Sequence, residues 1–400
     1  LNGNDANNGS TGSPVKTPQR ANTLASSGDT IKLRGSSAAN THYQAQLKIT
    51  KTNTTWEPDS GHTPIFNGGW DDSYLRADGT YNWPDSTCLP NIGTPGTPSF
   101  KEYGVMVQVA ANGVTVDSLD VRNVAGIAIV VTASNVAVTN CRVDHTFSNA
   151  INVNGEPGAP ITDIEVGYCT ISRVSFKGRI SDFTQLTGKR GTQGSFIALY
   201  AHDVWLHHNT MCYGMAEGIL ADRGGNRVTI EYNVVHTNNH LGIYINRTKN
   251  GIVRNNIVTH TYNSDFIEDK KGAVDYQVPS GIVIGDENGP KMPLDYHSEN
   301  QQVYNNIIIG MSCGIDVRNA YKLFPNGDPD GYTTQLKNAW IAHNTIIGRS
   351  RSMVGIRIDQ VAPEWGSSLA HQNSIVENNL VNMAHGEAGH TLGRGQGSTA

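Results

Sequence analysis

The chain is 400 residues long, carries a formal net charge of −5 and contains 43 glycines, while charged residues make up only 16% of it. This composition excludes a coiled coil or a helical bundle and favours β structure with many turns. The weak net charge argues against nucleic acid as a partner, and the sequence has no apolar run of about 18 residues that would span a membrane.

No signal peptide is visible, and because the sequence begins with Leu1 we expect that one has already been removed. We therefore expect a secreted protein, extracellular or periplasmic. The cysteines are few and scattered and form no CxxC pair, which argues against a disulfide scaffold and against structural zinc. They are Cys88, Cys141, Cys169, Cys212 and Cys313.

Residues 1–50 are predicted to form an N-terminal cap and the first coil of a stack of strands. Thr17 is a suitable capping residue and Pro18 a suitable first helical residue, so a short helix is expected over residues 19–25. A strand is expected over residues 30–33, and the helix would cover the open edge of the stack. Residues 51–103, which are rich in tryptophan and tyrosine, are predicted to be an insertion that packs as a lid.

From residue 104 the sequence repeats a short phrase in which an Asn is followed by a turn and then by a strand that begins Gly-Ile or similar. The equivalent positions are Leu119, Cys141, Cys169, Asn209, Asn233, Asn256, Asn306, Asn344 and Asn379. Their shortest spacings are 22 (119 to 141), 23 (233 to 256) and 24 (209 to 233) residues. A repeat of this length with short strands and no helix is one coil of a parallel β-helix, predicted here for residues 104–383.

The recurring Asn is expected to lie in an inward-facing turn. Equivalent side chains on neighbouring coils would be about 4.8 Å apart and would hydrogen-bond one another as a ladder. Cys141 and Cys169 occupy the same column. We expect them to be stacked, buried thiols and not a disulfide, since free cysteine behaves as a small core residue.

Apolar and variable residues alternate along the Gly-Ile strands, which predicts strands with one buried face. The inward positions are Ala221, Ile245, Ile284, Val317 and Ile358. One predicted outward column is Leu220, Tyr244, Val283, Asp316 and Arg357, and the next is Tyr200, Asp222, Asn246, Gly285, Arg318 and Asp359. Longer spacings mark insertions at residues 174–194, 261–279, 287–300, 320–337 and 361–373, which are predicted to flank this sheet on both sides and make it a groove. Residues 384–400 are predicted to be a flexible tail rich in Gly and Ser.

The opening GNDANNGSTGSPVKTPQRAN and the NNxV and GIxIxxR coils resemble the secreted right-handed parallel β-helix superfamily, which includes polysaccharide lyases, pectinase-like hydrolases and alginate epimerases. The resemblance covers roughly residues 1–383. It implies an all-β, single-stranded right-handed parallel β-helix (solenoid) with an N-terminal cap helix and loop insertions flanking one sheet. The DPH motif of the epimerases and the paired Asp and RIK-type motifs of polygalacturonases are missing. Asp222-Arg223 takes the comparable place after a Gly-Ile strand.

The chemically capable residues concentrate between positions 217 and 287, and stacking is expected to bring them together on one surface. They are Glu217, Asp222, Arg223, His240, Tyr244, Arg247, Asp286 and Glu287. The leading hypothesis is a lyase that cleaves a uronic-acid polysaccharide by β-elimination. In it, Arg223 and Arg247 bind the substrate carboxylate, and His240 or Tyr244 serves as base and acid. Alternatively, a calcium ion held by Asp222, Asn246 and Asp286 neutralises the carboxylate.

Two further hypotheses remain open. A glycoside hydrolase would use two carboxylates, for which Asp222 and Asp286, about 9–10 Å apart on alternate coils, are the candidates, with Glu217 and Glu287 as further ones. A non-catalytic extracellular protein would bind carbohydrate, mediate adhesion or form filaments. We expect a monomer in the enzyme case and self-assembly in the structural case. The same charged residues also have a purely structural interpretation, in which neighbouring opposite charges pair.

Overall fold

The computed structural model describes residues 3–35, 43–69, 104–124, 126–175, 194–214, 216–238, 240–261, 280–285, 298–318, 321–323, 329–331, 337–348, 354–358, 372–383 and 392–394. In these ranges the strands form three parallel sheets of 11, 10 and 11 strands and one antiparallel pair. We call the parallel sheets sheet 1, sheet 2 and sheet 3.

Each sheet takes one strand from every coil. Sheet 1 contains β1 (Thr30–Leu33), β3 (Thr55–Pro58), β6 (Thr115–Asp117), β9 (Val136–Thr139), β12 (Ile161–Gly167), β15 (Ala201–His207), β18 (Asn226–Glu231), β21 (Ile252–Arg254), β24 (Gln302–Tyr304), β29 (Trp340–Ala342) and β32 (Ile375–Glu377). Sheet 2 contains β4 (Ile65–Asn67), β7 (Asp120–Val124), β10 (Arg142–Thr146), β13 (Thr170–Ser172), β16 (Thr210–Cys212), β19 (Val234–His236), β22 (Ile257–Thr259), β25 (Ile307–Ile309), β30 (Thr345–Gly348) and β33 (Leu380–Met383). Sheet 3 contains β2 (Leu47–Ile49), β5 (Val105–Val109), β8 (Ile127–Val131), β11 (Ile151–Asn154), β14 (Gly194–Leu199), β17 (Glu217–Asp222), β20 (Leu241–Asn246), β23 (Ser280–Gly285), β26 (Cys313–Arg318), β31 (Val354–Ile358) and β34 (Leu392–Arg394). The antiparallel pair is β27 (Tyr321–Leu323) with β28 (Pro329–Gly331).

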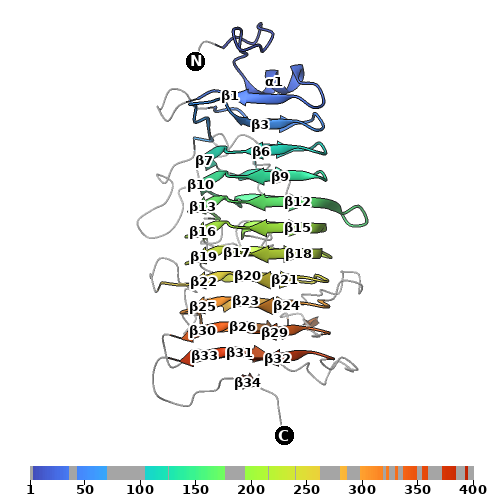
Figure 1. Ribbon diagram of the computed structural model, residues 1–400, viewed down its shortest axis with the longest axis vertical. Helices are drawn as coiled ribbons and strands as arrows, with labels where there is room; N and C mark the ends of the chain where they lie inside the picture. The colour runs from blue at the N-terminus through green and yellow to red at the C-terminus, as the bar shows by residue number, and fades with distance from the viewer. Residues whose placement is uncertain are drawn as a thin grey trace.

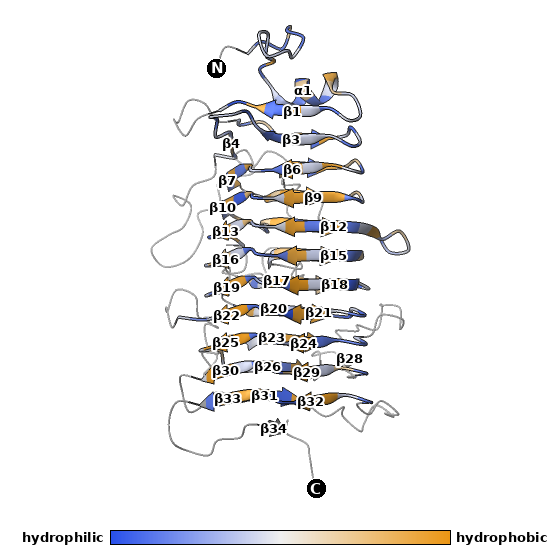
Figure 2. Cartoon of the chain, viewed as in Figure 1, coloured by the Kyte–Doolittle hydropathy of each residue, from blue (hydrophilic) through white to orange (hydrophobic). Residues whose placement is uncertain are grey.

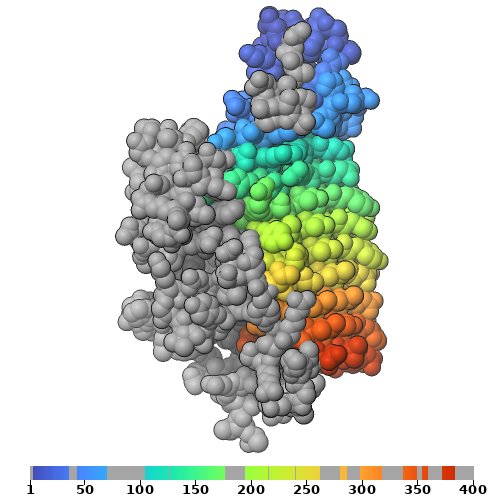
Figure 3. All heavy atoms as spheres, turned by 90° about the vertical axis from the view of Figure 1, so that its left-hand side faces the viewer, coloured from blue at the N-terminus to red at the C-terminus, as the bar shows by residue number. Residues whose placement is uncertain are grey.

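The chain winds repeatedly through the three sheets and builds a long stack of coils, with β1 near one end and β32 and β33 near the other (Figure 1). The space-filling view shows the coils as successive layers, coloured from blue to red (Figure 3). This arrangement confirms the predicted parallel β-helix.

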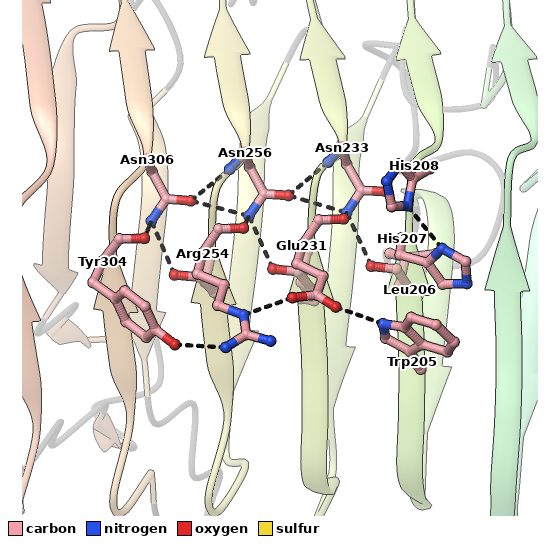
Figure 4. A network of polar contacts seen from close by, with 12 residues as sticks. Trp205, Leu206, His207, His208, Glu231, Asn233, Arg254, Asn256, Tyr304 and Asn306 are labelled. Atoms are coloured by element: carbon pink, nitrogen blue, oxygen red, sulfur yellow. Dashed lines mark hydrogen bonds and ion pairs between the residues drawn. The ribbon is translucent and has the colours of Figure 1, made fainter.

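The Asn ladder forms at the corner between sheets 1 and 2, as predicted. The backbone N–H and the Nδ2 group of Asn233 both donate to Oδ1 of Asn256, each at 3.0 Å, and Asn256 repeats the pattern with Asn306 (Figure 4). The ladder runs through Asn209, Asn233, Asn256, Asn306, Asn344 and Asn379. Each side chain thereby satisfies backbone groups that the corner would otherwise leave unpaired.

The residue before each ladder position turns the corner with a positive φ, for example +56° at Tyr232 and at Asn255. A second Asn ladder, which the sequence analysis missed, follows the exposed corner at the start of the sheet 1 strands. Its members are Asn226, Asn250, Asn300, Asn338 and Asn373. In this second ladder Asn250, Asn300, Asn338 and Asn373 themselves have positive φ, a backbone region that Asn tolerates better than most residues.

Inward-facing side chains from all three sheets fill a continuous apolar core. Ala221, Ile245, Ile284 and Val317 are part of it, and Ile358 packs against it, as predicted from alternation. Hydrophilic and hydrophobic residues alternate along the strands of sheet 1 in Figure 2, which is typical of strands with one buried face.

The N-terminal helix and strand also agree with the sequence prediction. Helix α1 spans Pro18–Leu24, and the Thr17 side chain accepts a hydrogen bond from the backbone N–H of Arg20 at 3.2 Å. The strand predicted over residues 30–33 is β1. Among the described residues, no helix is long and apolar enough to cross a membrane.

Two predicted boundaries require correction. Within residues 51–103, β3 pairs with β1 in sheet 1 and β4 pairs with β7 in sheet 2, so part of the expected insertion belongs to the solenoid. The rest of that range, residues 70–103, lies outside the described residues. Near the C-terminus, β34 pairs with β31, so sheet 3 continues into the segment predicted to be a flexible tail.

Cys141 and Cys169 are free thiols and are buried, in agreement with the prediction. A hydrogen bond with Cys169, together with burial, raises the pKa of the Cys141 thiol well above its usual value. Both residues therefore act as core residues in the coils that precede the Asn ladder.

Candidate functional site

The Gly-Ile strands form sheet 3, and their outward residues align across coils in register. Leu220 pairs with Tyr244, Tyr244 with Val283, Val283 with Asp316, and Asp316 with Arg357, which confirms the first predicted column. In the second column Asp222 pairs with Leu199 and not with the predicted Tyr200. Tyr200 has a positive φ of 48° just after β14, so the chain has already turned there.

Asp222 and Arg247 form a buried ion pair at the ends of β17 and β20. The guanidinium donates from Nε to Oδ1 at 2.8 Å and from Nη2 to Oδ2 at 2.6 Å, and each side chain is only 5% exposed. Burial raises the pKa of the Asp222 carboxyl above its usual value, although the adjacent guanidinium acts in the opposite direction. Removing one partner of such a pair costs about 3–5 kcal/mol, because it leaves a buried charge uncompensated.

Arg223 follows Asp222 and has a different environment. Its Nε lies 3.6 Å from Oδ2 of Asp222, and its side chain is 29% exposed. Its φ of 57° places it at the turn that leaves β17. Two arginines were predicted to bind a substrate carboxylate. Arg223 is the accessible one, whereas Arg247 is buried in its ion pair with Asp222.

Glu217 and His240 form a second polar pair, at the opposite end of the same strands. Nδ1 of His240 lies 2.9 Å from Oε1 of Glu217, with exposed side-chain fractions of 38% and 13%. A carboxylate only accepts hydrogen bonds, so a neutral His240 imidazole would donate from Nδ1 in this contact, and Nε2 would then be its basic nitrogen. The arrangement suits proton transfer to or from a ligand.

The predicted site residues therefore do not converge on one point. Glu217 and Asp222 are five residue steps apart on one extended strand, which corresponds to about 16 Å. Between the two polar pairs lie Leu220 and Tyr244, which belong to a buried apolar cluster on the outer face of sheet 3. The members of this cluster are Ile197, Leu199, Leu220, Leu241, Tyr244 and Val283.

Tyr244 is only 6% exposed, which differs from the open groove position that we predicted. Its hydroxyl leans toward the next coil, where a Cβ on Gly285 would lie 2.8 Å from the Tyr244 Oη. The absence of a side chain at Gly285 thus makes room for the phenol ring.

The predicted calcium ligands are placed only in part. Both carboxylate oxygens of Asp222 already accept hydrogen bonds from Arg247, so in this arrangement Asp222 does not fit a calcium ligand. Asn246 is buried nearby, and Asp286 lies outside the described residues. Within the described ranges no cluster of three or more His, Cys, Asp or Glu side chains fits a metal ion. The calcium set stays a prediction.

Glu287 and most of the five predicted insertions also lie outside the described residues, so the predicted flanks of the groove stay a prediction. On the same sheet, sequence reasoning missed a second ion pair, in which Asp316 is fully buried and Arg357 is 36% exposed. Arg357 donates to both oxygens of Asp316, from Nε at 2.8 Å and from Nη2 at 2.5 Å. The aligned column contained both residues, and their opposite charges on adjacent coils were the available signal.

A polar network on the outer face of sheet 1 was also missed. Glu231 accepts hydrogen bonds from Nε1 of Trp205 at 2.8 Å and from Nε of Arg254 at 2.6 Å, and Arg254 donates to the Tyr304 hydroxyl at 2.9 Å (Figure 4). These residues lie on successive strands from β15 to β24. Because the groups satisfy one another, the network is best explained as a set of contacts between coils.

The fold defines the class of protein: the chain is a parallel β-helix protein. Residues 103–278 match the family described as "Right handed beta helix region", which agrees with the predicted handedness. None of the curated proteins matches this chain in sequence.

Solved structures with the same fold include XylC in complex with xylose, with a TM-score of 0.57 and 12% identity over 95% of this chain and 85% of that chain. The GH136 lacto-N-biosidase from Eubacterium ramulus has a TM-score of 0.49 and 12% identity over 95% of this chain and 66% of that chain. A rhamnogalacturonan lyase has a TM-score of 0.48 and 12% identity over 94% of this chain and 86% of that chain. At such identities the likeness extends to the fold alone.

Proposed function

We propose that this protein is a secreted polysaccharide-active enzyme that cleaves a uronic-acid polymer by β-elimination on the outer face of sheet 3. The observation that carries the proposal is the accessible His240–Glu217 pair, which combines a base with a carboxylate that orients it. The fold shared with XylC, whose structure contains xylose, is consistent with a carbohydrate ligand.

In the proposed reaction, Nε2 of His240 removes the C5 proton of a uronic acid. The electron pair forms the C4–C5 double bond, the C4–O bond breaks, and the departing glycosidic oxygen takes up a proton from water. Glu217 holds the imidazole in the required tautomer and stabilises the imidazolium that forms. Arg223, which follows Asp222 beyond the far end of β17, would bind the carboxylate of another sugar of the same polymer.

A glycoside hydrolase is the second candidate, and the described carboxylates favour it less. An inverting enzyme needs two carboxylates about 6.5–9.5 Å apart. Glu217 and Asp222 are separated by about 16 Å of strand, and Asp222 is bound to Arg247.

The proposal is tested with alginate, pectate and glycosaminoglycans, by following the ultraviolet absorbance of the unsaturated product. We expect turnover on at least one polymer and a loss of about 10²–10⁴-fold in kcat for His240→Ala. His202→Ala, which removes a half-buried histidine of sheet 1, is the matched control and should retain activity.

Two results would contradict the proposal. Reducing ends released from a neutral glycan without an unsaturated product would indicate a hydrolase. No turnover on any polymer, combined with concentration-dependent assembly by size measurement and electron microscopy, would indicate a structural protein.

A further inference from the structure

Strand β11 of sheet 3 contains polar atoms that the protein does not satisfy. The Asn152 side chain is fully buried, yet neither its Oδ1 nor its Nδ2 has a hydrogen-bond partner in the structure. On the same strand, Oδ1 of Asn154 is also buried without a partner. An unpaired buried polar group costs about 1–3 kcal/mol, so this short strand contains an unusual concentration of unmet hydrogen bonds.

Both residues lie on the outer face of sheet 3. Asn152 pairs in register with Ile197, and Asn154 pairs with Leu199. Ile197 and Leu199 belong to the apolar cluster outside the solenoid core. Val153, which lies between Asn152 and Asn154 on the strand, belongs to the core. The two amides therefore lie beside the apolar cluster, on the face that carries the His240–Glu217 pair.

Exposure changes along this face from coil to coil. On the N-terminal side, Asn152 pairs with Val130, which is 6% exposed, and Val130 pairs with the half-buried Gln108. Thr132, just past the end of β8, is exposed. Asn154 itself is half-buried, while Ile197 and Leu199 are at most 5% exposed. Asn154 thus lies where an open part of the face meets its buried part, and Asn152 lies behind it among buried residues, so a ligand would reach the pair from the side of Asn154.

The unmet atoms indicate the chemistry of such a ligand. Two are acceptors, Oδ1 of Asn152 and Oδ1 of Asn154, and one is a donor, Nδ2 of Asn152. A carboxylate only accepts hydrogen bonds and would satisfy only the donor, whereas a hydroxyl both donates and accepts. Sugar C–H groups would in turn pack on Ile197 and Leu199, in the mixed apolar and polar setting that ligand sites typically provide.

We propose that Asn152 and Asn154 form a subsite that binds the hydroxyl groups of a sugar residue, on the N-terminal side of the His240–Glu217 pair. This inference rests on the proposed function for the identity of the polymer, but its chemistry concerns binding alone. In this proposal His240 takes part in the reaction, and Asn152 and Asn154 bind an adjacent part of the glycan.

The test measures binding and stability separately. Isothermal titration calorimetry is performed with trisaccharides of mannuronate, galacturonate, xylose and galactose on the wild type and on Asn152→Leu. We expect the wild type to bind at least one trisaccharide and Asn152→Leu to bind it at least about tenfold more weakly, since a missing hydrogen bond to a buried polar group is costly.

Thermal unfolding provides the second readout. Asn152→Leu should unfold at the same temperature as the wild type or higher, because it removes an unsatisfied amide. Asn246→Leu is the matched control: Asn246 is equally buried on the same face but has interaction partners, so its replacement should lower the unfolding temperature.

Unchanged trisaccharide affinity in Asn152→Leu would overturn the subsite, whether the variant is stabilised or destabilised. Failure of the proposed function gives a different result. A wild type without turnover that still binds a trisaccharide through Asn152 would refute the lyase and leave the subsite supported.

Discussion

Glu231 on β18 illustrates how a single carboxylate connects neighbouring coils. It is only 6% exposed, although it lies on the outer face of sheet 1. Burial by itself would raise its pKa, but hydrogen bonds from Arg254 and Trp205 outweigh this effect and lower the pKa below the usual 4.5. The folded state therefore favours the charged carboxylate more than the unfolded state does.

Glu231→Gln should destabilise the protein at pH 7 by about 1–3 kcal/mol, since it removes charge-assisted hydrogen bonds and places an amide against Arg254. A group with a lowered folded pKa contributes stability above its unfolded pKa, and the contribution is lost as the pH falls through the folded pKa. The difference between wild type and variant should therefore shrink as the pH falls below 4.5. Urea unfolding at a series of pH values measures it.

Glu377→Gln is the control for this measurement. Glu377 accepts a similar hydrogen bond from Nε1 of Trp340 at 3.0 Å, but it is exposed. Its replacement should change stability by less than about 0.5 kcal/mol. A Glu231→Gln effect that does not vary with pH would contradict the electrostatic explanation.

The site residues were predictable to different degrees. The pairing of Asp222 with Arg247 follows from opposite charges on neighbouring coils, and the sequence analysis considered such pairing as the structural interpretation. The separation of Glu217 from Asp222 could also be predicted from the sequence, because five residue steps along one strand span about 16 Å. The burial of Tyr244 was not readable, because alternation predicts which face a side chain is on and not what covers that face.

At the scale of elements, the Asn ladder at the corner between sheets 1 and 2 repeats the same contacts from coil to coil. Asn256 accepts two hydrogen bonds from Asn233, and its Nδ2 donates to the carbonyl oxygens of Ile230 and Arg254. One side chain thus satisfies groups of two strands, β18 and β21, and of the corner at Asn233, and its loss would leave several buried polar atoms unpaired.

Asn256→Ala should lower the free energy of unfolding by at least about 3 kcal/mol, because each unsatisfied buried group costs about 1–3 kcal/mol. Chemical denaturation measures the loss. Asn379→Ala, at the end of the same ladder, should cost clearly less, since Asn379 is only half-buried and water can replace its bonds. Equal losses at the two positions would contradict this account of the ladder.

The ladder was predictable because its Asn recurs at coil spacing within a fixed phrase. Strands β3 and β4 were missed because their coil lacks that phrase and lies in an aromatic-rich segment. There, Trp56 and Phe66 are fully buried core residues and not part of a lid. Aromatic composition alone does not distinguish a core strand from an insertion.

At the scale of the whole molecule, each coil contacts mainly the coils before and after it, as in other solenoids. Central coils are therefore supported on both sides, and terminal coils on one. The last strands of sheets 1 and 2 reflect this: Ile375 is 51% exposed and Leu380 63% exposed.

Hydrogen exchange should follow this difference. Backbone amides of β18 and β19 should exchange at least tenfold more slowly than those of β32 and β33, since local opening is easier where fewer neighbours must separate. Mass spectrometry of peptides covering residues 226–236 and 375–383 makes the comparison. Uniform protection along the chain would instead indicate a single cooperative unit.

The Glu217–His240 pair and the Asp222–Arg247 pair lie at opposite ends of the neighbouring strands β17 and β20 in sheet 3. The line between the two pairs therefore runs along the strands and perpendicular to the axis of the stack. Gain or loss of a whole coil would change the length of the rod by about 4.8 Å and leave this crosswise distance unchanged. The length of the rod can therefore vary with the number of coils. The spacing between His240 and Arg223 is set by strand length and stays constant.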